Sequence, residues 1–144
     1  MKPAPPDWPR MSASLYYADP LAAIDWLVRA FGFEVRMKIE TPAGILEHSE
    51  LTFGGAVVMV GRVKEGARSP STAGGYTGAL FFYVDDADAH AARAIAAGAV
   101  ITRPLADVDY GPEHWADRGY SCTDREGHLW HFAHRVRNPP SPSP

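Results

Sequence analysis

The pattern of apolar and polar residues repeats once along the chain. Residues 14–35 read SLYYADPLAAIDWLVRAFGFEV and residues 80–101 read LFFYVDDADAHAARAIAAGAVI, and the two segments align without a gap. Each segment opens with a short run of β-forming residues and continues with the helical spacing of apolar or alanine residues. An internal repeat of this kind indicates two copies of one structural unit.

A helix follows the first strand in both copies. The first helix is predicted at Pro20–Phe31, where proline suits the first helical turn because its missing N–H costs little there. Asp19 precedes it and supplies a carboxylate of the kind that caps a helix N-terminus. In the second copy, Asp85 aligns with Asp19 and the helix is predicted at Ala87–Ala97.

Three further strands are predicted after each helix. They lie at Glu34–Ile39, Ile45–Phe53 and Ala56–Gly61 in the first copy, and at Val100–Arg103, Arg118–Thr123 and His128–His134 in the second. The last two strands of each copy form a hairpin, because glycine in the connecting turns permits positive φ. The predicted fold class is therefore α+β, with two tandem βαβββ modules. Their eight strands form a curled mixed sheet around a cleft, with the helices outside.

Proline marks the two ends of the chain. Of 13 prolines, four lie within residues 1–9 and four within 138–144. Proline donates no backbone hydrogen bond, so we expect disordered ends around one folded domain. The expected boundaries are a Pro-rich end at 1–9, the domain at 10–136 and a Pro/Ser-rich tail at 137–144. Within the domain we expect module one at 10–63, a linker at 64–78 and module two at 79–136.

Alternation along the strands assigns side chains to the two faces of each sheet. Leu51, Phe53 and Val58 share an apolar face that must meet a helix. The other faces carry aromatic and titratable side chains, which is typical of a cleft for a flat organic ligand. The predicted ligand-binding residues are Tyr16, His48, Glu50, Met59, Phe81, Tyr83, Tyr120 and His131, with Trp115 on an extra loop at 107–115 that closes over them.

Three titratable residues of this set leave a catalytic alternative open. If His48, Glu50 and His131 converge, they supply a non-standard metal site or an acid–base pair. The simpler interpretation is that water, or the residues themselves, satisfy these polar groups. The histidines at 128, 131 and 134 do not form a metal site together, because strand residues three apart point to opposite faces.

Composition narrows the classes of function. The formal net charge of −3 and the isoelectric point near 6.0 argue against nucleic acid as a partner. Cys122 is the single cysteine and cannot form an internal disulfide, so we expect it to be buried apolar filler. With no signal peptide and no run of 18 apolar residues, the sequence predicts a cytoplasmic protein without a membrane partner.

The two-module pattern resembles the vicinal oxygen chelate superfamily of glyoxalase I, bleomycin-resistance proteins and extradiol dioxygenases. The residues that carry it are SLYYADPLAAIDWLVRAFGFE, ALFFYVDDADAHAARAIAAGA and DREGHLWHFA, where Arg125 replaces the usual proline. The resemblance implies four metal ligands, one each from strands one, four, five and eight. Those positions hold Ser12, Met59, Ala79 and His131, so we expect the usual metal site to be absent.

The resemblance and the composition of the cleft together predict a binding protein. We expect it to bind a small aromatic molecule without a cofactor and without catalysis, like the drug-sequestering antibiotic-resistance members of the superfamily. The alternative is a metal-dependent lyase, isomerase or dioxygenase with a non-standard site. A third alternative is an interaction module that uses its proline-rich ends. The resemblance also implies a homodimer.

Overall fold

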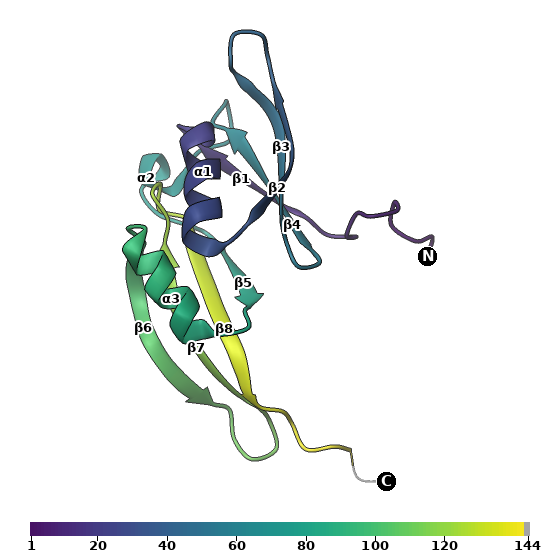
Figure 1. Ribbon diagram of the computed structural model, residues 1–144, viewed down its shortest axis with the longest axis vertical. Helices are drawn as coiled ribbons and strands as arrows, with labels where there is room; N and C mark the ends of the chain where they lie inside the picture. The colour runs from purple at the N-terminus through teal and green to yellow at the C-terminus, as the bar shows by residue number, and fades with distance from the viewer. Residues whose placement is uncertain (143–144) are drawn as a thin grey trace. The chain divides into compact units, whose positions relative to one another are not determined.

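The structure is a computed structural model that describes residues 1–142, so the last two residues of the predicted tail, 143–144, lie outside the described part. The elements of the first copy are β1 (Ala13–Tyr17), α1 (Pro20–Phe31), β2 (Glu34–Glu40), β3 (Leu46–Phe53) and β4 (Ala56–Arg62) (Figure 1). Those of the second are β5 (Ala79–Tyr83), α3 (Ala87–Ala96), β6 (Val100–Asp109), β7 (Ala116–Thr123) and β8 (Leu129–Arg137). A short helix, α2 (Pro70–Ala73), lies between the copies. This confirms the α+β class and the two βαβββ modules.

The chain forms two compact units, Met1–Gly75 (unit one) and Tyr76–Pro144 (unit two). Each unit contains one four-stranded mixed sheet, with strand order β1-β4-β3-β2 in unit one and β5-β8-β7-β6 in unit two. The first strand of each module pairs in parallel with the last, and the other pairs are antiparallel. Within residues 1–142, no helix is both long enough and apolar enough to cross a membrane.

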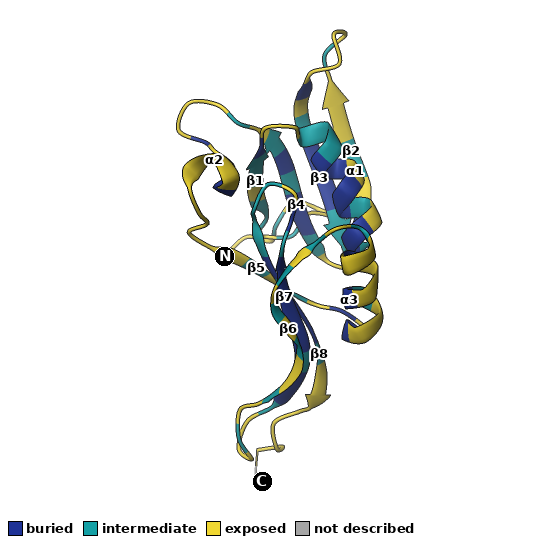
Figure 2. Ribbon diagram, turned by 90° about the vertical axis from the view of Figure 1, so that its left-hand side faces the viewer, coloured by how far each residue is buried: buried dark blue, intermediate teal, exposed yellow. Residues whose placement is uncertain are grey.

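Helix α1 covers the apolar face of the unit-one sheet. The side chain of Asp19 accepts a hydrogen bond from the backbone N–H of Ala22 at 3.2 Å, as the capping pattern predicts. Leu27 on the helix and Leu51 and Val58 on the sheet are buried, and Figure 2 shows this buried layer along α1 and the central strands. Burial of these apolar side chains is the main stabilising term for the unit.

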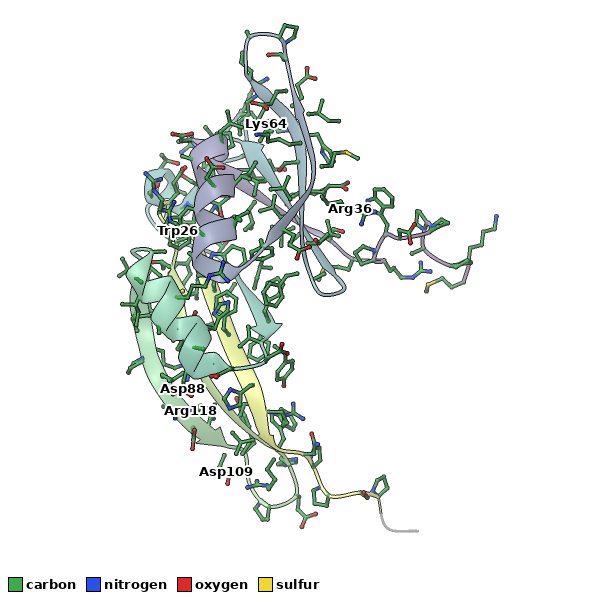
Figure 3. The ribbon with its side chains drawn as sticks, viewed as in Figure 1. Trp26, Arg36, Lys64, Asp88, Asp109 and Arg118 are labelled. Carbon is green, nitrogen blue, oxygen red and sulfur yellow. The ribbon has the colours of Figure 1, made fainter. Side chains whose placement is uncertain are left out.

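Helix α3 covers one face of the unit-two sheet. Trp130 and Phe132 of β8 stack on this face with an interplanar angle of 3°. Arg118 of β7 reaches Asp88 of α3 on the same side, with 2.8 Å between Nε and Oδ2 (Figure 3). The carboxylate that caps α3 belongs to Asp86 and not to Asp85, because the helix begins one residue later than the repeat alignment implies.

The β6–β7 hairpin is longer than predicted, and the loop expected at 107–115 is shorter, at 110–115. Strand β6 continues past Arg103 to Asp109, and β7 begins at Ala116. Pro104 does not end β6, because irregular pairing on either side of Arg103 accommodates a residue that donates no hydrogen bond. The extra residues of the second module therefore lengthen a hairpin, and Trp115 lies beside its turn.

Candidate functional site

Two aromatic side chains project from the face of the unit-two sheet opposite α3, which we call the open face. Phe81 and Tyr83 are 52% and 50% exposed, and their rings meet edge to face with centroids 5.1 Å apart. Phe82, between them on β5, packs against Trp130 on the helix side. Alternation along one strand thus divides these aromatic residues between the core and solvent.

A hydrogen-bonded row crosses the middle of the open face. The sheet register aligns Phe81 with His131, His131 with Ser121 and Ser121 with Arg103. The Ser121 hydroxyl lies 2.6 Å from Nδ1 of His131, and Nε of Arg103 donates to the same hydroxyl at 3.3 Å. Burial and the charge of Arg103 lower the pKa of His131, which favours the neutral imidazole. In the tautomer in which the Ser121 hydroxyl donates to Nδ1, the ring proton is on Nε2.

The next row of the open face is built from small residues. Tyr83 aligns with Ala133, and Ala133 with Gly119. A Cβ atom at residue 119 would lie 2.5 Å from the carbonyl oxygen of Phe132 and 2.8 Å from Cβ of Ala133. The strands therefore approach closely only because residue 119 is glycine, and they leave a floor without large side chains between Tyr83 and β6.

An ion pair between Arg135 and Asp117 lies beside the rings of Tyr83 and Trp115 at one end of the open face. Nε of Arg135 lies 2.6 Å from Oδ1 of Asp117, and the Tyr83 hydroxyl donates to Oδ2 of Asp117 at 3.0 Å. The Arg135 guanidinium also lies 5.2 Å from the ring centroid of Tyr83 and 5.6 Å from that of Trp115. Cation–π contacts at these distances restrain both rings.

The structure places Tyr120 on the face of the sheet that meets α3, so its predicted position in the cleft is wrong. Its hydroxyl lies 2.7 Å from Nδ1 of His90 on α3, and its ring stacks on Phe132. The reason is the register around the β7–β8 turn, which pairs Tyr120 with Phe132 and Ser121 with His131. The sequence identifies Ser121 only if the length of the β7–β8 turn is known, because that length sets the register.

In unit one, the predicted residues His48 and Glu50 lie close to each other on β3, and Glu50 contacts Trp8 of the N-terminal segment. Oε1 of Glu50 accepts a hydrogen bond from Nε1 of Trp8 at 3.2 Å and lies 3.2 Å from Nε2 of His48. Arg36 packs over the Trp8 ring at 3.6 Å, and its Nε lies 3.5 Å from Oε2 of Glu50. Figure 3 shows Arg36 beside the N-terminal segment.

Glu50 is 5% exposed and its side chain is ionised in this cluster. Burial raises its pKa, but hydrogen bonds with His48 and Trp8 and the charges of His48 and Arg36 outweigh burial. The pKa of Glu50 is therefore below its usual value. Among the described residues no hydrogen bond reaches Oε2, so the Arg36 guanidinium is the group that compensates that oxygen.

A cavity of about 300 Å³ lies beside Trp8 at the β3–β4 turn, with Arg36, Thr52 and Val57 among its walls.

The two other predicted residues of unit one, Tyr16 and Met59, lie on β1 and β4. Tyr16 is half-buried, and its ring packs where a side chain at Gly61 would project. Met59 is half-buried and aligns with Ser14 in the sheet.

The described residues do not fit the divalent metal that the resemblance implies. Within residues 1–142, no three His, Cys, Asp or Glu side chains gather as a metal site. His131 has Nδ1 engaged by Ser121 and lies close enough to Arg103 for that charge to lower its pKa, and a neighbouring cation disfavours metal binding.

Comparisons with known proteins give one family. A profile of the Glyoxalase/Bleomycin resistance protein/Dioxygenase superfamily matches residues 11–132. An uncharacterized protein of Mycobacterium bovis is 32% identical over 134 residues, which cover 90% of this chain and 85% of that protein. An uncharacterized protein of Mycobacterium tuberculosis is also 32% identical over 134 residues, covering 90% of this chain and 76% of that protein.

Solved structures agree on the fold. TioX from Micromonospora sp. ML1 is 38% identical, with a TM-score of 0.70 over 88% of this chain and 98% of that chain. The fosfomycin resistance protein FosX from Listeria monocytogenes is 13% identical, with a TM-score of 0.61 over 86% of this chain and 90% of that chain. At 13% identity the likeness to FosX is one of fold alone.

Proposed function

Because the chain belongs to the glyoxalase/bleomycin resistance protein/dioxygenase superfamily, we propose that it binds a small aromatic organic molecule on the open face of unit two, without metal-dependent chemistry. The observation that carries the proposal is the half-exposed pair Phe81 and Tyr83 beside the half-buried His131. The low floor at Gly119 and Ala133 leaves room for a flat ring to lie against these side chains.

Stacking and burial supply the binding free energy in this proposal. Edge-to-face and offset contacts of aromatic rings contribute about 0.5–1.5 kcal/mol per pair beyond the burial of apolar area. Tyr83 and Trp115 are already restrained by Arg135 and Asp117, so a ligand orders few further side chains when it binds. In unit one, the cavity beside Trp8 is lined by residues other than His48 and Glu50, whose predicted contacts with the ligand stay part of the proposal.

The proposal is tested by isothermal titration of the protein with 2-naphthol, a flat neutral probe. We expect saturable binding that Phe81→Ala weakens about tenfold or more, since the stacking partner is lost. Tyr76→Ala removes an aromatic residue that is 49% exposed and lies on no strand, and it should leave binding unchanged. Equal effects of the two substitutions, or no saturable binding, would contradict the proposal.

Elemental analysis of the purified protein tests the enzymatic alternative. We expect no stoichiometric divalent metal. A metal present at one equivalent and lost in His131→Ala would instead support a lyase, isomerase or dioxygenase with a non-standard site. We further propose that the protein is a homodimer, which sedimentation equilibrium checks directly.

A further inference from the structure

The backbone of β6 is irregular on both sides of Arg103. The pairing with β7 shifts between Ile101 and Arg103 and again between Arg103 and Ala106, and Pro104 lies within the second shift. Bulges of this kind change the direction in which a side chain points. Here the register places Arg103 opposite Ser121, and its guanidinium contacts the Ser121 hydroxyl and, at 3.5 Å, the carbonyl oxygen of Gly119.

Arg103 has no acidic partner among the described residues. Its contacts are the hydroxyl and the carbonyl oxygen, whereas several other arginines of the chain lie against carboxylates: Arg36, Arg118, Arg135 and Arg137. Arg103 is also half-buried, and a partly desolvated cation without a counter-charge is costly. The remaining guanidinium N–H groups are therefore available to an anion from outside the chain.

His131 adds a second donor beside this cation. Ser121 accepts from Arg103 and lies 2.6 Å from Nδ1 of His131; in the tautomer in which the hydroxyl donates to Nδ1, Nε2–H of the imidazole is a donor. Asp117, an acidic group on the open face, is already engaged by Arg135 and Tyr83. The middle of the open face is thus positively charged and rich in donors.

We propose that Arg103 and His131 bind a carboxylate carried by the aromatic ligand, whose ring lies against Phe81. This rests on the proposed function and specifies its ligand class as a flat aromatic acid. A guanidinium matches the two oxygens of a carboxylate with parallel hydrogen bonds, and charge-assisted bonds of this kind are stronger than neutral ones. Ser121 is a positioning residue, because its hydroxyl contacts both Arg103 and His131 and it does not itself contact the ligand.

Titration with a matched pair of probes tests this inference. The probes are 2-naphthol and 3-hydroxy-2-naphthoate, which share the ring and hydroxyl and differ by the carboxylate. We expect the wild type to bind the carboxylate probe at least tenfold more tightly, with an affinity that falls as salt rises. Arg103→Gln should remove that preference and leave the affinity for 2-naphthol within about twofold.

Two further variants make the result interpretable. Arg125→Gln neutralises an exposed arginine in the β7–β8 turn and should change neither affinity. Arg103→Lys keeps the positive charge but lacks the planar guanidinium that binds both carboxylate oxygens, and it replaces Arg103→Gln if that variant does not fold. We expect Arg103→Lys to retain part of the preference for the carboxylate probe. Equal affinity for both probes, unchanged by Arg103→Gln, overturns this inference alone. Failure of the wild type to bind either probe overturns the proposed function as well.

Discussion

Glu50 and Cys122 are both buried, and burial has different consequences for each. Burial and the nearby charge of Asp124 raise the pKa of the Cys122 thiol to about 12, so it stays a protonated, inert side chain, as expected of apolar filler. The pKa of Glu50 falls because His48, Trp8 and Arg36 outweigh burial. The carboxylate thereby fixes the N-terminal segment to the sheet of unit one.

The lowered pKa of Glu50 predicts how stability depends on pH. The folded protein binds this proton less tightly than the unfolded chain, so the stabilisation is complete above the unfolded pKa near 4.5 and is lost as pH falls through the folded pKa. We expect Glu50→Gln to lower the free energy of unfolding at pH 7 by about 1–2 kcal/mol, since charge-assisted hydrogen bonds are lost. The gap from wild type should narrow as pH falls below the unfolded pKa.

Urea denaturation at several pH values between about 3 and 7 measures this gap. Glu47→Gln is the matched control, because Glu47 is an exposed neighbour on the same strand. The prediction is wrong if the gap for Glu50→Gln is constant with pH or equals that of the control.

The elements differ in how well local sequence specifies them. Helix α1 has the predicted bounds, because Asp19, Pro20 and Gly32 mark its ends through local backbone geometry. Strand β6 extends to Asp109 instead of ending at Arg103, because hydrogen bonds to β7 continue past Pro104. A strand's length depends on its partner, and the partner lies elsewhere in the sequence.

The close approach of β7 and β8 at Gly119 gives a prediction for these elements. Gly119→Ala places a methyl group against backbone of β8, which cannot move as a flexible side chain does. We expect the free energy of unfolding to fall by about 1–3 kcal/mol, as for other overpacked sites. Gly78→Ala is the control, since a methyl group there would meet nothing within 4 Å. Guanidinium denaturation that finds the two variants equally stable would contradict the prediction.

At the scale of the whole molecule, contacts between distant residues tie down the end of β8. Arg137 donates to both oxygens of Asp109 and to the carbonyl oxygen of Gly111, which joins β8 to the β6–β7 turn. Arg135 also donates to the side chain of Asn138. Among the described residues after Asn138, at 139–142, all are exposed and none has a hydrogen bond or ion pair.

This difference predicts which part of the C-terminal end contributes to stability. A chain that stops at Asn138 should melt within about 1 °C of the full chain, because it keeps every described contact. Arg137→Ala should lower the melting temperature by about 1–3 °C in either length, since exposed ion pairs contribute little individually. Differential scanning calorimetry compares the full and shortened chains, each with and without the substitution. A larger effect of truncation than of Arg137→Ala would show that the tail stabilises the fold.

The sequence by itself determined the repeat, the helices α1 and α3, the fold class and the superfamily, because periodicity and helix capping are local properties. It also indicated Phe81, Tyr83 and His131 as neighbours, since strand alternation holds over short distances. Tertiary structure decided that Ser121 and not Tyr120 lies beside His131, and that Arg103 points to the same face. Turn length and bulges set the register between strands, and a shift of one residue exchanges the two faces.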